Sequence, residues 1–464
     1  MSGAAPSVHG QWSSRLVFIL ATVGFAVGLG NIWRFPYLAG VNGGGAFVLI
    51  YIFCVALIAT PIIMAELLIG RRGRMTPVGS LQRLAVEAGQ SEKWALAGFV
   101  PLLAILGISS FYMVIGGWTL DYAWKAITGS FAGVTPESAE AKFNALLANP
   151  GELILWQIVF IAINVAVVVR GLRGGIEKAA LILMPVLILM LVGLAVYAMI
   201  TGDARDGLAF LFQPDFSKVT AQTWVEALGQ AFFSVSVGTA GLVVYGAYLP
   251  RHVHIPSSSG MIAAADTGVA LLAGMAIFPF VFAYGMSPSA GPGLMFVAMP
   301  VALSGTAAPT LLTLLFFLLL AVAALTSSIA ILETLVARAV ERGWPRSKAV
   351  PAAAVLIFLL GLLTVFSFNA WAGIHPLAFL PGFETRTFFD SIDWVTSNLG
   401  LTLGGLTSAL FAGWVMHKAA TAEELGTSPQ SGAFRLWRFL LRWPVPVTIV
   451  VLIIFAFLGS VSGG

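Results

Sequence analysis

Oxygen-bearing side chains interrupt four otherwise apolar stretches of this sequence. Asn31 follows one glycine-rich run, Ser234 begins another, Asp266 lies mid-stretch, and Thr326 and Ser327 are neighbours in a fourth. Hard cations such as sodium take oxygen ligands from carboxylates, carbonyls and hydroxyls. A hydroxyl in a membrane helix can instead bond its own turn, which is the structural alternative for Thr326 and Ser327. These residue types point to a cation site if the fold brings them together.

Three carboxylates lie inside apolar stretches, at Glu66, Asp266 and Glu333. A carboxylate inside a membrane is costly, and it is a functional-site hypothesis by default. For Glu66 and Glu333 we expect structural pairing with backbone N–H groups. Asp266 stays a candidate ion ligand.

The elements that must position these residues are membrane-spanning helices. Hydrophobic residues make up 59% of the 464 residues and charged residues only 9%, whereas soluble chains carry about 25% charged residues. Apolar runs follow one another along the chain, and each needs about 20 residues to cross a bilayer as a helix. A transmembrane barrel would show segments of about 10 alternating residues, which this sequence lacks. The sequence therefore predicts an all-α polytopic membrane protein.

We expect eleven transmembrane helices within a single domain, residues 1–464. They are placed at 13–38, 43–70, 94–126, 153–170, 177–201, 224–249, 260–286, 308–340, 349–368, 392–416 and 441–461. Basic residues concentrate on alternate loops, as at Arg71, Arg170, Arg251, Arg342 and Arg435. The positive-inside rule then puts the N-terminus in the cytoplasm and, with eleven spans, the C-terminus outside.

Two glycine-rich runs lie in the middle of spans, at residues 24–31 and 234–241. Small residues can serve helix packing alone. Two such runs five spans apart, however, are typical of broken helices one and six, which place free N–H groups and carbonyls at a transporter's ligand site. The spacing fits a 5+5 inverted repeat, with repeat one at about 13–201, repeat two at about 224–416 and an extra helix at about 441–461.

Several longer motifs resemble the neurotransmitter:sodium symporter family. They are Trp12-Ser13-Ser14-Arg15, residues 28–37 (GLGNIWRFPY), residues 42–47 (NGGGAF), residues 230–236 (QAFFSVS), Gly291-Pro292-Gly293-Leu294 and residues 325–330 (LTSSIA). The matches are ordered and correctly spaced from Trp12 to about Lys348, while spans nine to eleven match mainly in arrangement. Eleven spans are typical of bacterial members.

The resemblance implies a sodium-coupled secondary active symporter that imports a neutral amino acid by alternating access. The alternatives are a sodium-dependent membrane amino-acid sensor, or a symporter of another small carboxylate or zwitterion. A channel would explain the broken helices, but it needs no amino-acid pocket. We expect no enzyme, because the sequence has neither a P-loop nor an apparent catalytic triad, and we expect no organic cofactor and no nucleic-acid partner. Membrane lipid and an amino-acid substrate are the expected partners, the location is a bacterial inner membrane, and the oligomeric state stays open.

Two sodium sites follow from the resemblance. The first would use the Ala26 carbonyl, Asn31, Ser234 and Asp266, completed by the substrate carboxylate. The second would use the carbonyls of Gly24, Val27 and Ala323 with the hydroxyls of Thr326 and Ser327.

The resemblance also implies a substrate site between the two broken helices. The substrate carboxylate would rest on the Leu29 and Gly30 amides and the Tyr112 hydroxyl. The remaining substrate-binding residues are Phe25, Ala26, Gly28, Ile108, Phe233, Ser234, Ser236, Thr239, Ser327 and Ile331.

Departures from the family's patterns refine these expectations. Gly28 lies where monoamine transporters carry an aspartate, so we expect a substrate with its own carboxylate. Asp266 lies where many animal members carry asparagine and depend on chloride. A fixed carboxylate can balance the sodium charge, so we expect chloride independence; whether protons are counter-transported through Asp266 stays open. Thr239 and Phe25 replace a phenylalanine and an asparagine of the bacterial leucine transporter, which leaves side-chain selectivity open.

Gates are expected on both sides of the site. Arg34 and Asp393 would form the outer ion pair, a weak contact that suits a gate that must open. On the inner side, His9 and Glu341 align with the family's latch, although His9 replaces an arginine and puts the pairing in doubt. Trp12 would plug the inner vestibule.

Overall fold

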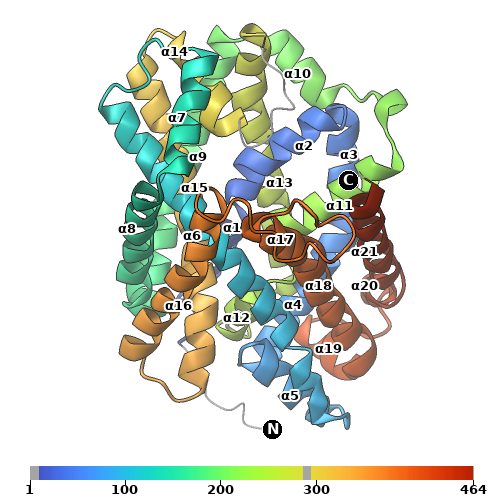
Figure 1. Cartoon of the computed structure of the whole chain (residues 1–464). Helices are drawn as coiled ribbons and strands as arrows, with labels where there is room; N and C mark the ends of the chain where they lie inside the picture. Colours follow the sequence, from blue (N-terminus) through green and yellow to red (C-terminus); the bar gives the residue numbers. More distant parts are fainter. Residues whose placement is uncertain (1–9, 286–293, 463–464) are drawn as a thin grey trace.

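The computed structural model describes residues 10–285 and 294–462, and this part of the chain is mostly helical (Figure 1). The first predicted span is a broken pair, α1 (Arg15–Ala26) and α2 (Phe35–Val41), and a wider helical turn over Gly30–Arg34 leads directly into α2. Spans two to five are α3 (Gly45–Cys54) with α4 (Thr60–Gly73), α6 (Phe99–Ile127), α8 (Pro150–Val168) and α9 (Glu177–Thr201). Spans six to eight are α11 (Ala221–Ser234) with α12 (Gly241–Ala247), α13 (Ile255–Ala283) and α15 (Pro309–Glu341). Spans nine to eleven are α16 (Arg346–Ser367), α17 (Phe388–Trp394) with α18 (Leu401–Leu410), and α20 (Gly432–Arg442) with α21 (Pro444–Ser462).

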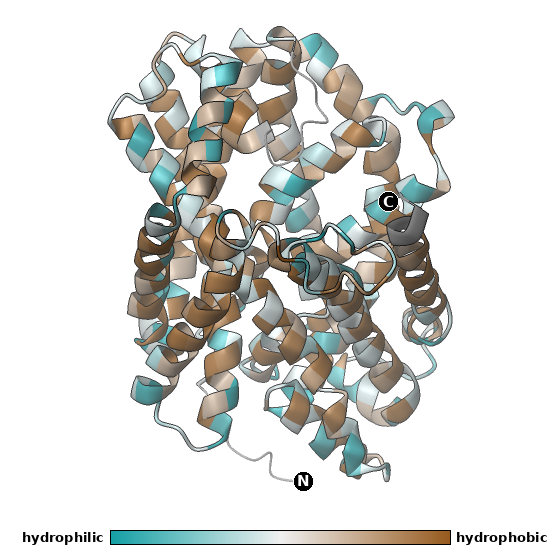
Figure 2. Cartoon of the chain, in the orientation of Figure 1, coloured by the Kyte–Doolittle hydropathy of each residue, from teal (hydrophilic) through white to brown (hydrophobic). Residues whose placement is uncertain are grey.

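Shorter helices cover the two ends of this bundle. They are α5 (Pro77–Glu87), α7 (Pro136–Ala148), α10 (Ala204–Phe212), α14 (Met299–Ser304) and α19 (Lys418–Glu424). Helices α7, α10 and α14 gather at one end of the molecule, while α5 and α19 lie at the other (Figure 1). Figure 2 shows hydrophilic residues concentrated at both ends and hydrophobic residues along the middle, as expected for a protein that crosses a membrane.

The predicted helical membrane fold is confirmed, whereas the count of eleven spans stays a prediction. Among the described residues, eight helices are long and apolar enough to cross a membrane, and ten if each of two bent pairs is one span. The predicted sixth span is split into α11 and α12, so neither part reaches that length.

The break between α11 and α12 depends on backbone conformations that few residues adopt. Ser236, Gly238 and Ala240 have φ angles of 56°, 78° and 68°, in the left-handed region that disfavours most L-residues. At Gly238 a Cβ atom would also lie 2.0 Å from the carbonyl oxygen of Leu401. Glycine there permits both the turn and the close approach of α18.

The break in the first span is milder. Helix α1 ends at Ala26, and Val27 is extended, with φ −72° and ψ 102°. The two halves, Arg15–Ala26 and Gly30–Val41, are bent by 53°. Because an extended residue leaves the carbonyls before it without helical partners, this bend supplies oxygen atoms to the interior.

Candidate functional site

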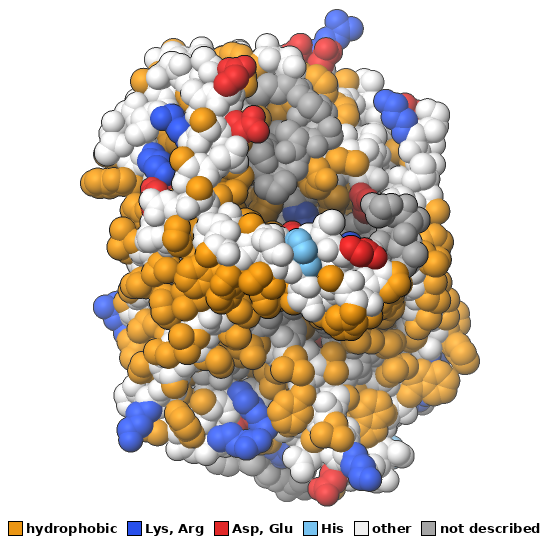
Figure 3. Space-filling model, viewed as in Figure 1, with side chains coloured by type: hydrophobic (Ala, Val, Ile, Leu, Met, Phe, Trp, Pro, Cys, Tyr) orange, Lys and Arg blue, Asp and Glu red, His pale blue; other side chains and the backbone are white. Residues whose placement is uncertain are grey.

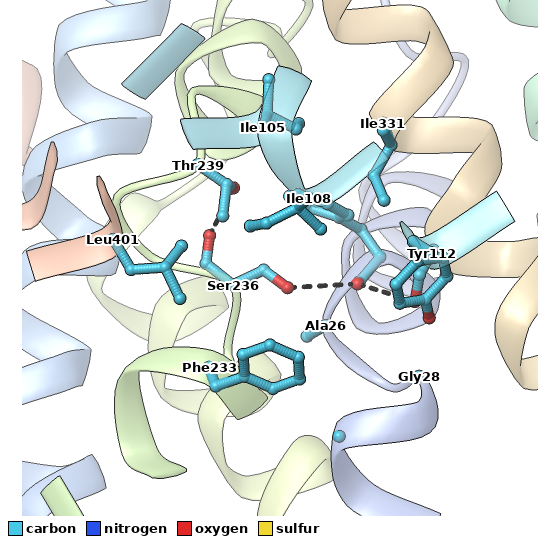
Figure 4. A pocket seen from close by; sticks show the side chains of 13 residues that line it. Ala26, Gly28, Ile105, Ile108, Tyr112, Phe233, Ser236, Thr239, Ile331 and Leu401 are labelled. Carbon is cyan, nitrogen blue, oxygen red and sulfur yellow. Dashed lines mark hydrogen bonds between the residues drawn. The ribbon is translucent and has the colours of Figure 1, made fainter. Parts of the chain in front are cut away.

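Both breaks open onto one small cavity of about 40 Å³ in the middle of the bundle (Figure 4). Its walls come from the two broken spans together with α6, α15 and α18. The lining residues are Phe25, Ala26, Gly28, Gly30, Ile105, Ile108, Tyr112, Phe233, Ser236, Thr239, Ser327, Ile331 and Leu401. Eleven of the thirteen predicted substrate residues are in this set; of the others, Leu29 lines a neighbouring cavity and Ser234 belongs to a polar cluster.

The cavity wall includes two residues that sequence reasoning missed. Ile105 lies one helical turn before Ile108 on α6, so helical periodicity was a signal that could have found it. Leu401 begins α18, in the part of the chain where the family resemblance rests on arrangement and offers no motif.

Three residues predicted for the first sodium site form one buried cluster. The Asn31 side-chain amide donates to Asp266 Oδ1 at 2.7 Å and to Ser234 Oγ at 2.9 Å. The Ser234 hydroxyl donates to Asp266 Oδ2 at 2.5 Å. All three residues are 0% exposed. The fourth predicted ligand, Ala26, lines the cavity.

Tyr51 completes this cluster and was not predicted. Its hydroxyl lies 3.0 Å from Ser234 Oγ and 3.3 Å from Asp266 Oδ2. A tyrosine inside an apolar span needs a partner for its hydroxyl, which was the available signal. The side chains that donate to the Asp266 carboxylate are thus all neutral. A buried carboxylate with neutral partners favours a nearby cation, because unbalanced buried charge is costly.

Residues predicted for the second sodium site meet where α15 passes the break in span one. The Ser327 hydroxyl lies 3.3 Å from the carbonyl oxygens of both Gly24 and Val27. The Thr326 hydroxyl lies 3.4 Å from the Val27 carbonyl and 2.9 Å from the Ala323 carbonyl in its own helix. The Thr326 hydroxyl therefore does bond to its own helix, which was the structural alternative to a cation ligand. The same hydroxyl also faces span one.

Glycines 28 and 30 let the backbone approach the cavity walls. A Cβ at Gly28 would lie 2.5 Å from both the Tyr112 hydroxyl and Ser327 Oγ, and one at Gly30 would lie 2.7 Å from the Phe233 ring. The Leu29 amide donates to the Tyr112 hydroxyl at 3.4 Å. The Leu29 N–H and the Tyr112 hydroxyl, two groups of the predicted carboxylate cradle, are thus neighbours, and the cradle itself stays a prediction.

The opposite wall of the cavity is built by the unwound segment of span six. The Ser236 hydroxyl donates to the Phe25 carbonyl at 3.3 Å, and the Thr239 hydroxyl donates to the Ser236 carbonyl at 2.7 Å (Figure 4). The Phe25 ring packs over Gly241, where a Cβ would lie 2.3 Å from it. Phe25 therefore sets the depth of the cavity on the α12 side.

A second cavity, of about 180 Å³, lies next to the first. Tyr112 and Phe233 line both cavities and so separate them, and Arg34 and Asp393 line the second. The Arg34 guanidinium lies 4.6 Å from the centre of the Phe233 ring. The Asp393 carboxylate accepts a hydrogen bond from Ser397 at 2.9 Å. Among the described residues no ion pair joins Arg34 to Asp393, so the predicted outer pair faces one cavity without closing it.

Trp12, the predicted inner plug, is buried near the start of span one. This residue is 2% exposed, its backbone N–H donates to the Tyr248 carbonyl at 3.1 Å, and its indole N–H donates to the Tyr245 carbonyl at 3.0 Å. Its ring meets the Tyr245 ring edge-on at 5.1 Å. Trp12 therefore packs against α12 inside the bundle.

The predicted inner latch is described on one side only, because His9 lies outside the described residues. Glu341, at the end of α15, accepts hydrogen bonds from the backbone N–H of Thr76 and, at 2.6 Å, from the Thr76 hydroxyl. Arg338 lies 3.1 Å from the same carboxylate. Glu341 thus ties α15 to the start of α5.

The two other carboxylates inside spans behave differently from each other. Glu66 accepts a hydrogen bond from the Gly238 backbone N–H at 2.9 Å, as expected. Within the described residues Glu333 has side-chain partners instead of backbone ones: it forms an ion pair with Arg346 and accepts from the Tyr248 hydroxyl at 2.8 Å. The prediction for Glu333 was wrong because Arg346 begins the next helix, α16, and reaches back to it.

Comparisons with known proteins agree with this arrangement. A sequence profile of the "Sodium:neurotransmitter symporter family" matches residues 9–139 and 137–461. The chain is 36% identical to an "Uncharacterized sodium-dependent transporter YhdH" of Bacillus subtilis, covering 95% of this chain and 96% of the relative. It is 33% identical to an uncharacterized sodium-dependent transporter of Haemophilus influenzae, covering 96% and 97% respectively.

The names of a more distant relative and of a similar solved structure mention amino acids. A "Sodium-dependent nutrient amino acid transporter 1" of Drosophila pseudoobscura pseudoobscura is 26% identical over 78% of this chain and 64% of its own length. The crystal structure of MhsT in complex with L-phenylalanine superposes with a TM-score of 0.88 and 39% identity, covering 97% of this chain and 100% of that one. The profile match along nearly the whole sequence, with relatives above 30% identity over their full length, shows that the chain belongs to the sodium:neurotransmitter symporter family.

Proposed function

We propose that the protein imports a neutral amino acid in symport with sodium and without chloride. One observation supports this most directly: two oxygen-rich clusters lie beside the same small cavity, whose lining is mostly apolar. Sodium-dependent relatives include proteins named as amino-acid transporters, and the structural match holds phenylalanine. An apolar cavity with a few convergent polar groups suits a zwitterion with an uncharged side chain.

The first sodium ion binds at the Asn31, Ser234 and Asp266 cluster, with the Ala26 carbonyl and the substrate carboxylate as further ligands. The Asn31 amide turns its N–H groups toward Asp266, and its Oδ1 accepts from the Gly28 N–H at 3.2 Å. A cation needs that amide oxygen. Sodium binding therefore rotates the Asn31 amide and removes the hydrogen-bond acceptor of Gly28.

The substrate carboxylate then binds at the break in span one. The Leu29 and Gly30 amides and the Tyr112 hydroxyl surround it, and a buried N–H left without an acceptor costs about 1–3 kcal/mol. A carboxylate supplies such an acceptor beside Gly28 and a ligand for the ion. The substrate side chain fills the space between Phe25, Ile108 and the unwound segment of span six.

The second sodium ion binds between span one and α15. The carbonyls of Gly24, Val27 and Ala323 and the hydroxyls of Thr326 and Ser327 are its ligands. Because these atoms come from two helices, occupancy holds α1 against α15 and release lets them part. This site couples the ion to the movement of the inner half of span one.

The gates act on the two sides of the cavity. Arg34 and Asp393, which share the outer cavity, approach each other when substrate is bound and Phe233 covers it. On the other side Trp12 and the Glu341 contacts hold the bundle closed until α1 tilts; His9 belongs to the proposed latch by alignment alone. Ligands shift such an equilibrium only by their different affinities for its states.

The basic loops support a cytoplasmic N-terminus and an external C-terminus, and the bacterial relatives support a location in a bacterial inner membrane. The direction of transport then follows from the sodium gradient and the membrane potential, which is worth about 2.3 kcal/mol per charge at 100 mV.

The test is uptake of a panel of labelled amino acids into proteoliposomes, with and without an inward sodium gradient and with chloride replaced by gluconate. We expect saturable, sodium-dependent accumulation that is unchanged by gluconate. Sodium-dependent binding without accumulation would indicate a sensor and not a symporter. The proposal would be refuted if no amino acid is bound and none is taken up.

A further inference from the structure

A groove of about 430 Å³ runs along the outside of the bundle between α6, α15 and α16. It shares no lining residue with the substrate cavity. Its walls are leucine and alanine side chains, among them Leu103, Leu335 and Leu356, and one end carries Arg338 and Arg342. The volume is within the range of about 300–1,000 Å³ found for small-molecule sites.

The apolar walls of this groove face outward from helices that cross the membrane. Leu103 is 64% exposed and Leu356 is 45% exposed, although α6, α15 and α16 are all long enough and apolar enough to span. Figure 3 shows a broad hydrophobic band with basic side chains below it. Lipid chains are the solvent for such a surface.

The charged end of the groove lies where headgroups are expected. The hairpin between α15 and α16 is at the same end of the molecule as α5 (Figure 1). Trp344, which also lines the groove, is 51% exposed, and exposed tryptophan is typical of the membrane–water interface. The apolar part of the groove, where an acyl chain would lie, therefore continues directly into the charged end, where a headgroup would lie.

The two arginines give this end a net positive charge. Arg338 lies 3.1 Å from Glu341, but that carboxylate is 2% exposed, is not part of the groove lining and also accepts from Thr76. Arg342 is exposed and, within the described ranges, forms no ion pair. Guanidinium groups bind phosphate in a planar, two-pronged geometry.

We propose that this groove binds an anionic phospholipid, with an acyl chain along the leucine walls and the phosphate between Arg338 and Arg342. Basic pockets between membrane helices recognise anionic headgroups, and each basic residue near the surface contributes about fivefold in affinity. The charge favours an anionic lipid over a zwitterionic one, and the hydrophobic length favours a lipid over a free anion. The proposal depends on the chain's being a membrane protein and not on its substrate.

The experiment is native mass spectrometry of the full-length protein in detergent, titrated with phosphatidylglycerol or phosphatidylethanolamine of identical acyl chains. We expect the wild type to bind phosphatidylglycerol more tightly. The R338Q/R342Q variant should lose about 25-fold in affinity for phosphatidylglycerol, at about fivefold for each arginine, and little for phosphatidylethanolamine.

Two further variants separate the parts of the groove. Ala352→Trp fills the apolar wall and keeps both arginines, so it should weaken both lipids. Arg435→Gln removes an exposed arginine from α20 and should change neither affinity. If R338Q/R342Q does not fold, as judged by its thermal midpoint, Arg342→Gln and Ala352→Trp decide the question.

Several outcomes would overturn the proposal. They are equal affinity of the wild type for both lipids, unchanged binding in R338Q/R342Q, and displacement of phosphatidylglycerol by soluble glycerol phosphate, which would indicate a free-anion site. A protein dimer that disappears in Ala352→Trp would show that a second copy covers the groove instead.

Discussion

Replacing Asp266 by asparagine should weaken sodium binding and make it depend on chloride. The carboxylate is fully buried and its side-chain donors are Asn31, Ser234 and Tyr51, all neutral. Asparagine has nearly the same size but no charge. The variant therefore tests charge with little change in packing.

The magnitude follows from the charge removed. Two unit charges 4 Å apart attract by about 4 kcal/mol at an effective dielectric constant of about 20. Hydrogen bonds from three neighbours already stabilise part of the Asp266 charge, so we expect a loss of about 2–4 kcal/mol, or about 30- to 700-fold in sodium affinity. Chloride should recover part of this loss, because the hydroxyls of Ser234 and Tyr51 are then free to donate to an anion.

The assay is sodium-dependent binding of a labelled substrate to purified protein, at constant ionic strength in chloride and in gluconate. Wild type should bind equally in both, and Asp266→Asn should bind measurably only in chloride. Glu66→Gln, which neutralises another buried carboxylate away from the cluster, should match the wild type in both buffers. A variant at Asp266 whose sodium affinity in gluconate stays within threefold of wild type would refute the role of this charge.

Three further substitutions test the cavity and the packing around it. Phe25→Ala enlarges the cavity, so competition uptake should show at least a tenfold shift in kcat/KM from alanine toward tryptophan; an unchanged preference would place the side-chain pocket elsewhere. Glu66→Ala leaves the Gly238 N–H without its acceptor and should destabilise the protein by about 1–3 kcal/mol, visible as a lower thermal midpoint in detergent, while Glu66→Gln keeps an acceptor and loses less; equal midpoints would contradict this. Gly70→Ala would put a Cβ 1.9 Å from an α12 carbonyl and should cost about 1–3 kcal/mol by overpacking, whereas Gly193→Ala meets open space and should be tolerated; similar midpoints for the two would argue against tight packing of α4 on α12.

The helices of this fold were predictable because membrane spans have a strong signal. Apolar runs bounded by charges set the limits of α8 and α9 to within a few residues, and mid-span glycines located both breaks. The irregular turn over residues 235–240 was located by its glycines, but its three left-handed residues were not, because Ser236 and Ala240 carry no conformational signature. Their conformations depend on tertiary contacts, such as the close approach of Gly238 to Leu401 of α18 and the hydrogen bond from Ser236 to the Phe25 carbonyl.

The candidate site was predictable where motifs carried it and not elsewhere. The fold brings Asn31, Ser234 and Asp266 together from three spans. The sequence around each one, taken alone, indicates only a polar residue in an apolar helix. Tyr51 escaped prediction because a lone tyrosine in a span is usually packing. The ion pair of Glu333 escaped as well, because it depends on how α16 turns back on α15.

In the proposed mechanism, the Asn31 side chain couples sodium binding to substrate binding. Its Oδ1 accepts from Gly28 at 3.2 Å and its Nδ2 donates to Asp266 at 2.7 Å, so turning Oδ1 toward a sodium ion beside Asp266 breaks the hydrogen bond to Gly28. Rotation toward the ion strands the Gly28 N–H in a buried site, and that N–H favours a carboxylate arriving beside it. The amine that remains when the carboxylate is removed from the substrate would leave the ion one ligand short and this N–H without an acceptor. Sodium and substrate affinity are then coupled by necessity, each raising the other by the same factor, and Asn31→Ala should reduce that factor toward one.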